Sequence, residues 1–252
     1  MTNISIFIIT VQNSRNFDNL VESLVQNFGV YPSILLGVTP KDLPCFGTAT
    51  HVHKGKYRPL SCHEVAAALS HSRARELALT QGNNWNIFLE DDSELIQTDI
   101  SDFIANLLQL PSGIPFFLHL FPEQNGILIR SKYCGMKSIC KMPDYANAYA
   151  FNAEGLKLFL KNTNRIHLYL ADWPTFPSQI KKVAPKRSIF RHPFQSIESS
   201  LISNERMRIQ AHSRAFTLNH RIKHACFRIF RIPLRRVGSE KIASENLRSV
   251  DW

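Results

Sequence analysis

Three consecutive carboxylates, Glu90, Asp91 and Asp92, directly follow an apolar run that ends at Leu89. Charged residues placed straight after a buried strand lie at the carboxyl edge of a parallel sheet, where open α/β folds bind their ligands. In an extended chain Glu90 and Asp92 point the same way, and two carboxylates on one side can hold a hard divalent cation that neutralises a diphosphate. The alternative is a solvated acidic loop without a ligand, because acidic triplets after strands are common.

Polar residues on a predicted helix form a second candidate group. The segment Ser61-Cys62-His63-Glu64 is an S-x-x-E capping box, and it opens an Ala- and Leu-rich stretch that runs to about Thr80. Glu64 and His71 are seven residues apart, about two helical turns, so they share a face, and Ser70 is next to His71. Capping already explains Glu64, and a single His on a helix is commonly structural, so both kinds of role remain open.

A third candidate is Asp172, which lies where an apolar segment ends, in the sequence Leu170-Ala171-Asp172-Trp173-Pro174. A carboxylate next to Trp suits a sugar site and can act as a general base on an acceptor hydroxyl. An Asp that precedes Trp-Pro is equally well explained as a turn former.

These groups need a scaffold, and the chain supplies one by alternating strand and helix patterns. Residues 4–11 are continuously apolar and rich in β-branched side chains, as in a central strand covered on both faces. Apolar residues at helical spacing follow from Phe17 to Phe28, and Gly29 stands where a helix-ending glycine belongs. The other predicted elements are strands at 33–38, 85–89, 114–121 and 149–151, the capped helix, and helices at 100–108 and 153–162, the last capped by Asn152. This order predicts an α/β fold with a largely parallel sheet flanked by helices.

Length and composition are those of a globular domain with a small extension. The chain has 252 residues, of which 44% are hydrophobic and 20% charged, which excludes disorder, collagen and coiled coil. The longest apolar runs, 4–11 and 114–121, are far shorter than the roughly 20 residues that span a bilayer. The N-terminus has no basic residue before its apolar run and no cleavage site, and the five cysteines contain no C-x-x-C pair. We therefore expect reduced thiols and a cytoplasmic protein.

The charge is strongly basic, with a formal net charge of +10. Residues 201–252 contain eleven Lys and Arg but four Asp and Glu, so this segment carries +7. Residues 220–236 can form a basic amphipathic helix, which would lie on an anionic membrane surface, contact nucleic acid phosphates, or simply dock on the domain through its apolar stripe. A nuclease-type protein that uses the carboxylates for Mg²⁺ and the basic segment for phosphates is the alternative function.

Taken in order, several short motifs resemble glycosyltransferase family 25, which includes bacterial lipooligosaccharide galactosyltransferases. The resemblance spans most of residues 3 to about 205, and Thr10 and Asn16 are departures from the family pattern. Its strongest motif is Leu89-Glu90-Asp91-Asp92, about twenty residues after Ser70-His71. The other matching positions are Ile8 to Val11 with Ser14 and Arg15, Glu64, Ala148-Tyr149 with Gly155, Asp172, Pro193 with Gln195, and Ser199-Ser200.

The resemblance implies a GT-A-like fold and the transfer of a hexose, most often galactose, from a UDP-sugar to a saccharide hydroxyl of lipooligosaccharide or lipopolysaccharide. Glu90 and Asp92 then stand in the position of the metal-binding D-x-D element and would hold Mn²⁺ or Mg²⁺. Ser14 and Arg15 would meet the nucleotide. The substrate-binding residues would also include a group on the capped helix, namely Glu64, Ser70 and His71.

The resemblance further implies an inverting transfer, in which a carboxylate deprotonates the acceptor. Asp172 is the candidate base and Asp91 the alternative. We expect a catalytic domain at 1–200 and a basic C-terminal extension at 201–252 that holds the protein against the inner face of the cytoplasmic membrane. The expected partners are a UDP-hexose donor, a lipid-linked oligosaccharide acceptor and anionic lipid, with no nucleic acid.

Overall fold

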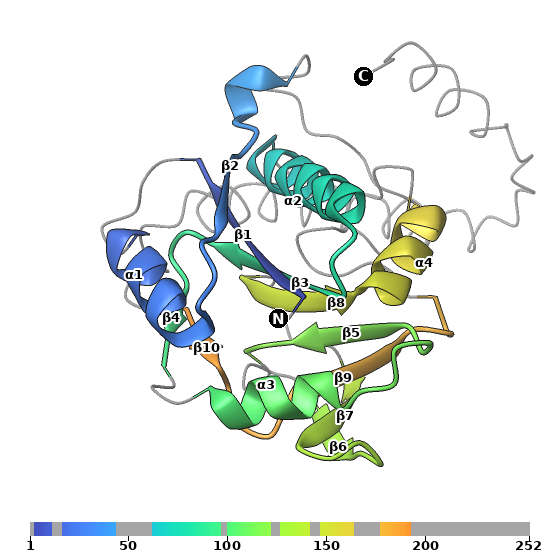
Figure 1. Cartoon of the computed structure of the whole chain (residues 1–252). Helices are drawn as coiled ribbons and strands as arrows, with labels where there is room; N and C mark the ends of the chain where they lie inside the picture. Colours follow the sequence, from blue (N-terminus) through green and yellow to red (C-terminus); the bar gives the residue numbers. More distant parts are fainter. Residues whose placement is uncertain are drawn as a thin grey trace, which may run out of the picture. The chain divides into compact units, whose positions relative to one another are not determined.

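The computed structural model of the chain shows a central sheet with helices on both of its faces (Figure 1). The structure describes residues 3–11, 17–43, 62–96, 100–121, 127–141, 147–163 and 177–192. Each of the seven residues of the first strand, β1 (Ile4–Thr10), is buried, which is why the strand is apolar except for Ser5 and Thr10.

The first half of the sheet is parallel, as the repeated strand and helix patterns predict. Strand β1 lies between β2 (Ser33–Leu36) and β3 (Trp85–Glu90) and is parallel to both. The connections are α1 (Phe17–Phe28) and α2 (Cys62–Gln81), with a short 3-10 helix, η1 (Pro40–Asp42), between β2 and α2. Gly29 has φ 64°, which confirms it as the residue that ends α1.

The second half of the sheet is not purely parallel. An antiparallel strand lies between β3 and the next parallel strand of the sheet. After the short strand β4 (Glu94–Leu95) and helix α3 (Ser101–Leu108), strand β5 (Phe116–His119) does not pair with β3. Strand β8 (Ala148–Asn152) lies between β3 and β5 and is antiparallel to both. Helix α4 (Ala153–Thr163) begins directly after β8.

Asn152 caps α4 as predicted and also joins it to the sheet. Its Oδ1 accepts hydrogen bonds from the backbone N–H of Gly155 at 2.9 Å and of Phe116 at 2.7 Å, and its Nδ2 donates to the carbonyl of Ile114 at 2.7 Å. A Cβ on Gly155 would lie 2.2 Å from the carbonyl oxygen of Phe116, so only glycine permits this close contact between α4 and β5.

Three strands that the sequence patterns did not reveal complete the sheet. They are β6 (Ile127–Arg130), β7 (Met136–Lys141) and β9 (Lys181–Pro185), and the order is β2-β1-β3-β8-β5-β9-β7-β6. Strand β9 is parallel to β5, whereas β7 is antiparallel to β9 and to β6. Only β8 and β7 therefore run against the other six strands. A separate two-stranded ribbon pairs β4 with β10 (Phe190–Arg191).

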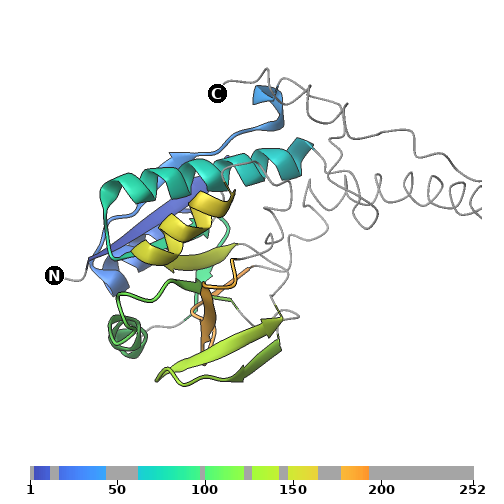
Figure 2. The same ribbon diagram turned by 90° about the vertical axis from the view of Figure 1, so that its right-hand side faces the viewer.

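Two apolar cores lie on the two faces of this sheet, and each is covered by its own helices (Figure 2). One core packs α1 and α3 against residues of β1 and β3 such as Ile6 and Leu89. The other packs α2 and α4 against the alternate residues of the same strands, such as Phe7 and Phe88. Because successive residues of a strand point to opposite faces of the sheet, the position of a residue along its strand determines which pair of helices its side chain faces.

The predicted α/β class is confirmed: the protein has a mostly parallel, mixed sheet flanked by helices. None of the helices in the described part of the chain is both long and apolar enough to cross a membrane. Residues 201–252 lie outside the described residues, so the division into a catalytic domain and a basic extension stays a prediction.

Candidate active site at the carboxyl edge of the sheet

The acidic triplet forms a turn rather than the extended segment that the sequence suggested. Strand β3 ends at Glu90, whose carbonyl oxygen accepts a hydrogen bond from the backbone N–H of Ser93 at 3.0 Å. The backbone N–H of Glu90 donates to the carbonyl of Asn147 on one side, and that of Asp91 donates to the carbonyl of Ile9 on the other. The extended backbone that was expected for the triplet is therefore replaced by a turn after Glu90, and the three carboxylates meet different partners.

Glu90 is tied to helix α2 through His71. The Nε2 of His71 lies 3.1 Å from Oε1 of Glu90, and its Nδ1 lies 3.0 Å from the hydroxyl oxygen of Tyr149. His71 is 2% exposed and Tyr149 is fully buried, whereas Glu90 is half-buried at the end of its strand. The antiparallel pairing of β8 with β3 brings Tyr149 opposite Phe88, on the sheet face that α2 covers.

A buried arginine sets the direction of the hydrogen bonds in this chain. Arg75, one turn along α2 from His71, is 1% exposed, stacks over the ring of Phe159 at 5.1 Å, and donates a hydrogen bond to the hydroxyl of Tyr149. Burial raises the pKa of Tyr149 to about 12, although Arg75 partly offsets this, so the phenol keeps its proton. Because Arg75 only donates, that proton goes to Nδ1 of His71, and Nε2 then donates to Glu90.

Asp91 is the carboxylate whose ionisation is most perturbed. The register of β1 and β3 places Thr10 beside it, and the Thr10 hydroxyl donates to Oδ2 of Asp91 at 2.5 Å. Burial raises the pKa of Asp91 to about 6, the Thr10 hydrogen bond opposes this rise, and the negative charges of Asp92 and Glu90 add to it. A carboxylate with this pKa is ionised at neutral pH and is well matched to accept a proton.

Asp92 is held from the other side by the ribbon of β4 and β10. The pairing of Arg191 with Glu94 brings the next residue, His192, to the turn, and its Nε2 lies 2.9 Å from Oδ2 of Asp92. The second oxygen of Asp92, Oδ1, is buried and has no hydrogen-bond partner among the described residues. Burying an unpaired carboxylate oxygen is costly, so this atom is a natural position for a ligand.

Asn147 adds further unpaired polar atoms at the same place. It is 1% exposed, and its carbonyl accepts hydrogen bonds from the backbone of Glu90 and from the hydroxyl of Ser93 at 2.8 Å. Both polar atoms of its side-chain amide are buried and lack partners within the described part of the chain. The edge of the sheet therefore combines anionic oxygens with an unused amide donor and acceptor.

The predicted site residues divide into those that the structure brings together and those that it does not describe. His71 and the three carboxylates form one cluster. Ser70 is buried, and its hydroxyl donates to the carbonyl of Ala66 and accepts from the backbone N–H of Val38, so it fastens the segment after β2 to α2. The other predicted positions are not described: Ser14, Arg15 and Asp172 lie outside the described residues, as does the side chain of Glu64.

Several residues of the cluster had no signal of their own in the sequence. His192 follows Asp92 by a hundred residues, and only the ribbon of β4 and β10 brings the two together. Arg75 was not singled out in the sequence, where its spacing of four from His71 is the one sign that the two share a face. Tyr149 belonged to a predicted strand, but its role depended on the antiparallel placement of β8.

The carboxylates suit a divalent cation that is shared with a substrate. No group of three His, Cys, Asp or Glu in the described ranges is arranged as a complete metal site. Mg²⁺ commonly takes only one or two protein carboxylates and completes its shell with substrate phosphates and water. Oxygen ligands from Glu90 and Asp92, one of them buried without a partner, fit such a cation.

No protein-family model and no curated protein matches the chain. Three solved structures are similar to it in outline. A mannose-1-phosphate geranyltransferase from Thermus thermophilus has a TM-score of 0.40 and 10% identity, over 76% of this chain and 75% of that one. A197 from STIV has a TM-score of 0.36 and 12% identity, over 75% and 85%. A glycosyltransferase involved in the glycosylation of the major capsid of PBCV-1 has a TM-score of 0.39 and 14% identity, over 75% and 92%.

Proposed function

We propose that the protein is a divalent-metal-dependent glycosyltransferase of the family 25 type. It would move a hexose, most simply galactose, from a UDP-sugar to a saccharide hydroxyl of lipooligosaccharide or lipopolysaccharide, with inversion. The observation that carries the proposal is the acidic turn at the carboxyl edge of the sheet. There a carboxylate with a pKa of about 6, Asp91, lies between two others that can share a cation with a diphosphate.

Asp91 is the described candidate for the general base. An acceptor hydroxyl that attacks the anomeric carbon of the donor loses its proton, and the bond from that carbon to the diphosphate oxygen breaks with its electron pair on UDP. An ionised Asp91 takes up the proton, and the Thr10 hydroxyl holds the carboxylate in one orientation. Asp172, the other candidate base, lies outside the described residues.

Glu90 and Asp92 are the residues that would hold Mn²⁺ or Mg²⁺. When bound, such a cation supplies positive charge against the charge that develops on the departing UDP. His71 and His192 then act as positioning residues, since each donates to one carboxylate oxygen and leaves the other oxygen of that group to a ligand. The chain through Tyr149 and Arg75 fixes the tautomer of His71 for this purpose.

The remaining partners follow from the resemblance and belong to the same proposal. Ser14 and Arg15 would contact the nucleotide, and Glu64 would line the site. The acceptor would be a lipid-linked oligosaccharide at the inner face of the cytoplasmic membrane. Residues 201–252, with a net charge of +7, would hold the protein on anionic lipid.

The test measures UDP release by the purified full chain from UDP-galactose, UDP-glucose and the two UDP-N-acetylhexosamines, with Mn²⁺ and with chelator. We expect metal-stimulated release from at least one donor, loss of that release in Asp92→Asn, and full retention in Asp102→Asn, a matched control on the exposed face of α3. Absence of metal-stimulated release from every donor would refute the proposal. Mg²⁺-dependent cleavage of DNA or RNA that is lost in Asp92→Asn would support the nuclease alternative instead.

A further inference from the structure

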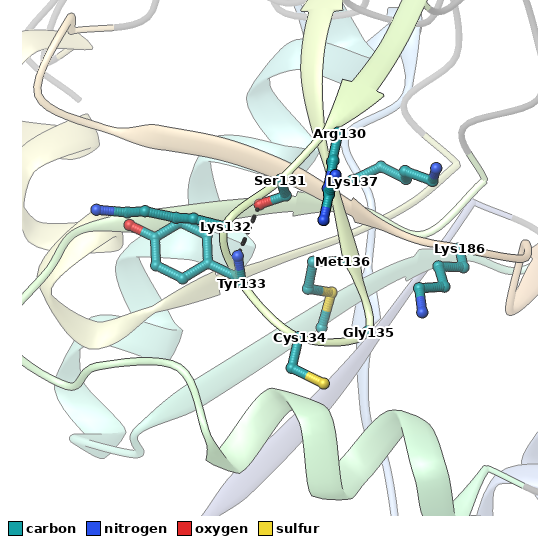
Figure 3. Close-up of a pocket in the computed structure, with 9 residues that line it drawn as sticks. All are labelled: Arg130, Ser131, Lys132, Tyr133, Cys134, Gly135, Met136, Lys137 and Lys186. Carbon is teal, nitrogen blue, oxygen red and sulfur yellow. Dashed lines mark hydrogen bonds between the residues drawn. The ribbon is translucent and has the colours of Figure 1, made fainter.

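A basic hollow lies at the hairpin of β6 and β7 (Figure 3), on the half of the sheet that does not contain β3. The turn between β6 and β7, the adjoining ends of these strands and the residue after β9 line this open hollow, which has a volume of about 410 Å³. Its lining includes four cations, Arg130, Lys132, Lys137 and Lys186. Figure 3 shows Lys137 and Lys186 extending on the same side of the hairpin, while Lys132 lies back along the ring of Tyr133.

The segments that form this hollow carry a large share of the positive charge of the chain. Residues 127–141 contain four Lys and Arg and residues 177–191 contain five, and neither segment contains an Asp or Glu. Of the four cations in the lining, none takes part in an ion pair with another described residue. Like charges gathered without counter-charges repel one another, so this arrangement favours an anionic ligand.

The hairpin turn is fixed in place, so the cations start from a defined scaffold. Gly135 has φ 70°, and a Cβ there would lie 2.2 Å from the side chain of Asn106 on α3. The ring of Tyr133 packs edge-on against the ring of Phe116, and the two ring centroids are 5.0 Å apart. The backbone N–H of Tyr133 donates a hydrogen bond to the hydroxyl of Ser131 at 3.1 Å. A preorganised turn lowers the entropic cost of binding.

The register of the sheet places the hollow on the same edge as the acidic turn. Asn86 of β3 pairs with Phe151, Phe151 with Phe117, and Phe117 with Lys182 of β9. Four residues further along these two parallel strands come Glu90 and Lys186, which therefore stand at the same level. Three strand spacings separate the two strands, and the twist of the sheet moves their ends further apart, so the two residues are on the order of 20 Å from each other.

We infer that this hollow binds a phosphate group of the acceptor, so that the substrate class is a phosphorylated saccharide. Phosphate offers several acceptor oxygens and up to two negative charges, which suits an Arg and Lys cluster. An acceptor anchored by its phosphate at Lys137 and Lys186 reaches along the sheet edge toward Asp91. The role as an acceptor subsite rests on the proposed function, whereas the binding of phosphate does not.

Two exposed thiols on the hairpin allow a local test, because Cys134 lines the hollow and Cys140 does not. The rate of alkylation of each thiol by iodoacetamide is measured by peptide mass spectrometry with inorganic phosphate or chloride at equal ionic strength. We expect saturating phosphate to slow alkylation of Cys134 by about tenfold and to leave Cys140 unchanged. Equal rates in phosphate and chloride at Cys134 would overturn the inference.

Variants and probes then identify the source of the phosphate. Lys137→Ala with Lys186→Ala should abolish the protection, and Lys157→Ala with Lys161→Ala, an equal loss of charge on α4, should retain it. Retained protection in the first pair would also overturn the inference. Protection by glucose 6-phosphate but not by glucose indicates a soluble acceptor, and protection by phosphatidylcholine vesicles only when they contain phosphatidic acid indicates a lipid-carried phosphate.

The same samples separate this inference from the proposed function. The Lys157 and Lys161 variant should release UDP from the donor at the rate of the parent chain when no acceptor is present, because neither residue lies at the acidic turn or lines the hollow. If phosphate protects Cys134 but the chain releases no UDP, the phosphate site is supported and the proposed glycosyltransferase activity is refuted. If the metal stimulates UDP release but phosphate does not protect Cys134, the proposed enzyme activity is supported and the phosphate subsite is refuted.

Discussion

Asp91→Asn should stabilise the fold at neutral pH while it abolishes transfer. Moving the pKa from 3.8 to about 6 costs the ionised native state about 3 kcal/mol at about 1.4 kcal/mol per unit. Because the carboxyl group is only half-buried, water screens part of this cost, and we expect about 1–2 kcal/mol. An amide at position 91 carries no charge, and its oxygen still accepts the Thr10 hydrogen bond.

The pH dependence of the stability gained in Asp91→Asn identifies the cause of that gain. Since the pKa of Asp91 is higher in the native state, that state binds more protons than the unfolded chain between about pH 4 and 6, and the stability of the parent falls as pH rises through this window. The gain from Asp91→Asn should therefore be full at pH 7.5 and decline towards zero at pH 4. Urea unfolding followed by tryptophan fluorescence measures it, with Asp102→Asn as the control. A loss of stability at pH 7.5, or a gain that does not depend on pH, would refute the reasoning.

Three further predictions concern neighbouring contacts. The rate of metal-stimulated transfer should rise with pH through an apparent pKa near 6. Thr10→Val should move this rise to higher pH, because it removes the hydrogen bond that lowers the pKa of Asp91, and a pH-rate profile of both proteins tests this. Tyr149→Phe should cost about 1–3 kcal/mol in thermal unfolding by leaving Arg75 and His71 without their shared partner, and should weaken Mn²⁺ activation; unchanged stability and activation would contradict the buried chain. Gly155→Ala should cost at least about 1 kcal/mol through the clash with Phe116, whereas Gly113→Ala, where a Cβ meets nothing within 4 Å, should be nearly neutral.

The elements that the sequence predicted correctly are those whose pattern is local. The apolar run of β1, the spacing of α1 up to Gly29, the length of α2 and the capping of α4 by Asn152 each depend on a few neighbouring residues. Strands β6, β7 and β9 were missed because they are short and combine a few apolar residues with basic and small side chains, without the continuous apolar run of a central strand.

The site shows the same division between local and distant information. The carboxylates and His71 were found because position after a strand and spacing on a helix are visible in one segment. The hydrogen bonds that make them a cluster depend on contacts across the chain, such as His192 with Asp92 and Tyr149 with His71. The positive charge was likewise assigned mainly to residues 201–252, whereas the β6, β7 and β9 segments, with nine cations and no carboxylate, form a second basic region.

The insertion of β8 between β3 and β5 dictates an order of assembly. A nascent chain that has emerged only as far as residue 121 contains β1, β2 and β3 but leaves β3 as a bare edge, because its neighbour β8 begins only at Ala148. The apolar rows of β3 and β5 then face water until residues 148–152 arrive, and exposed strand edges of this kind invite pairing between chains. Synthesis that stalls before β8 should therefore yield an aggregation-prone fragment, and the same short strand that completes the candidate site also closes the sheet.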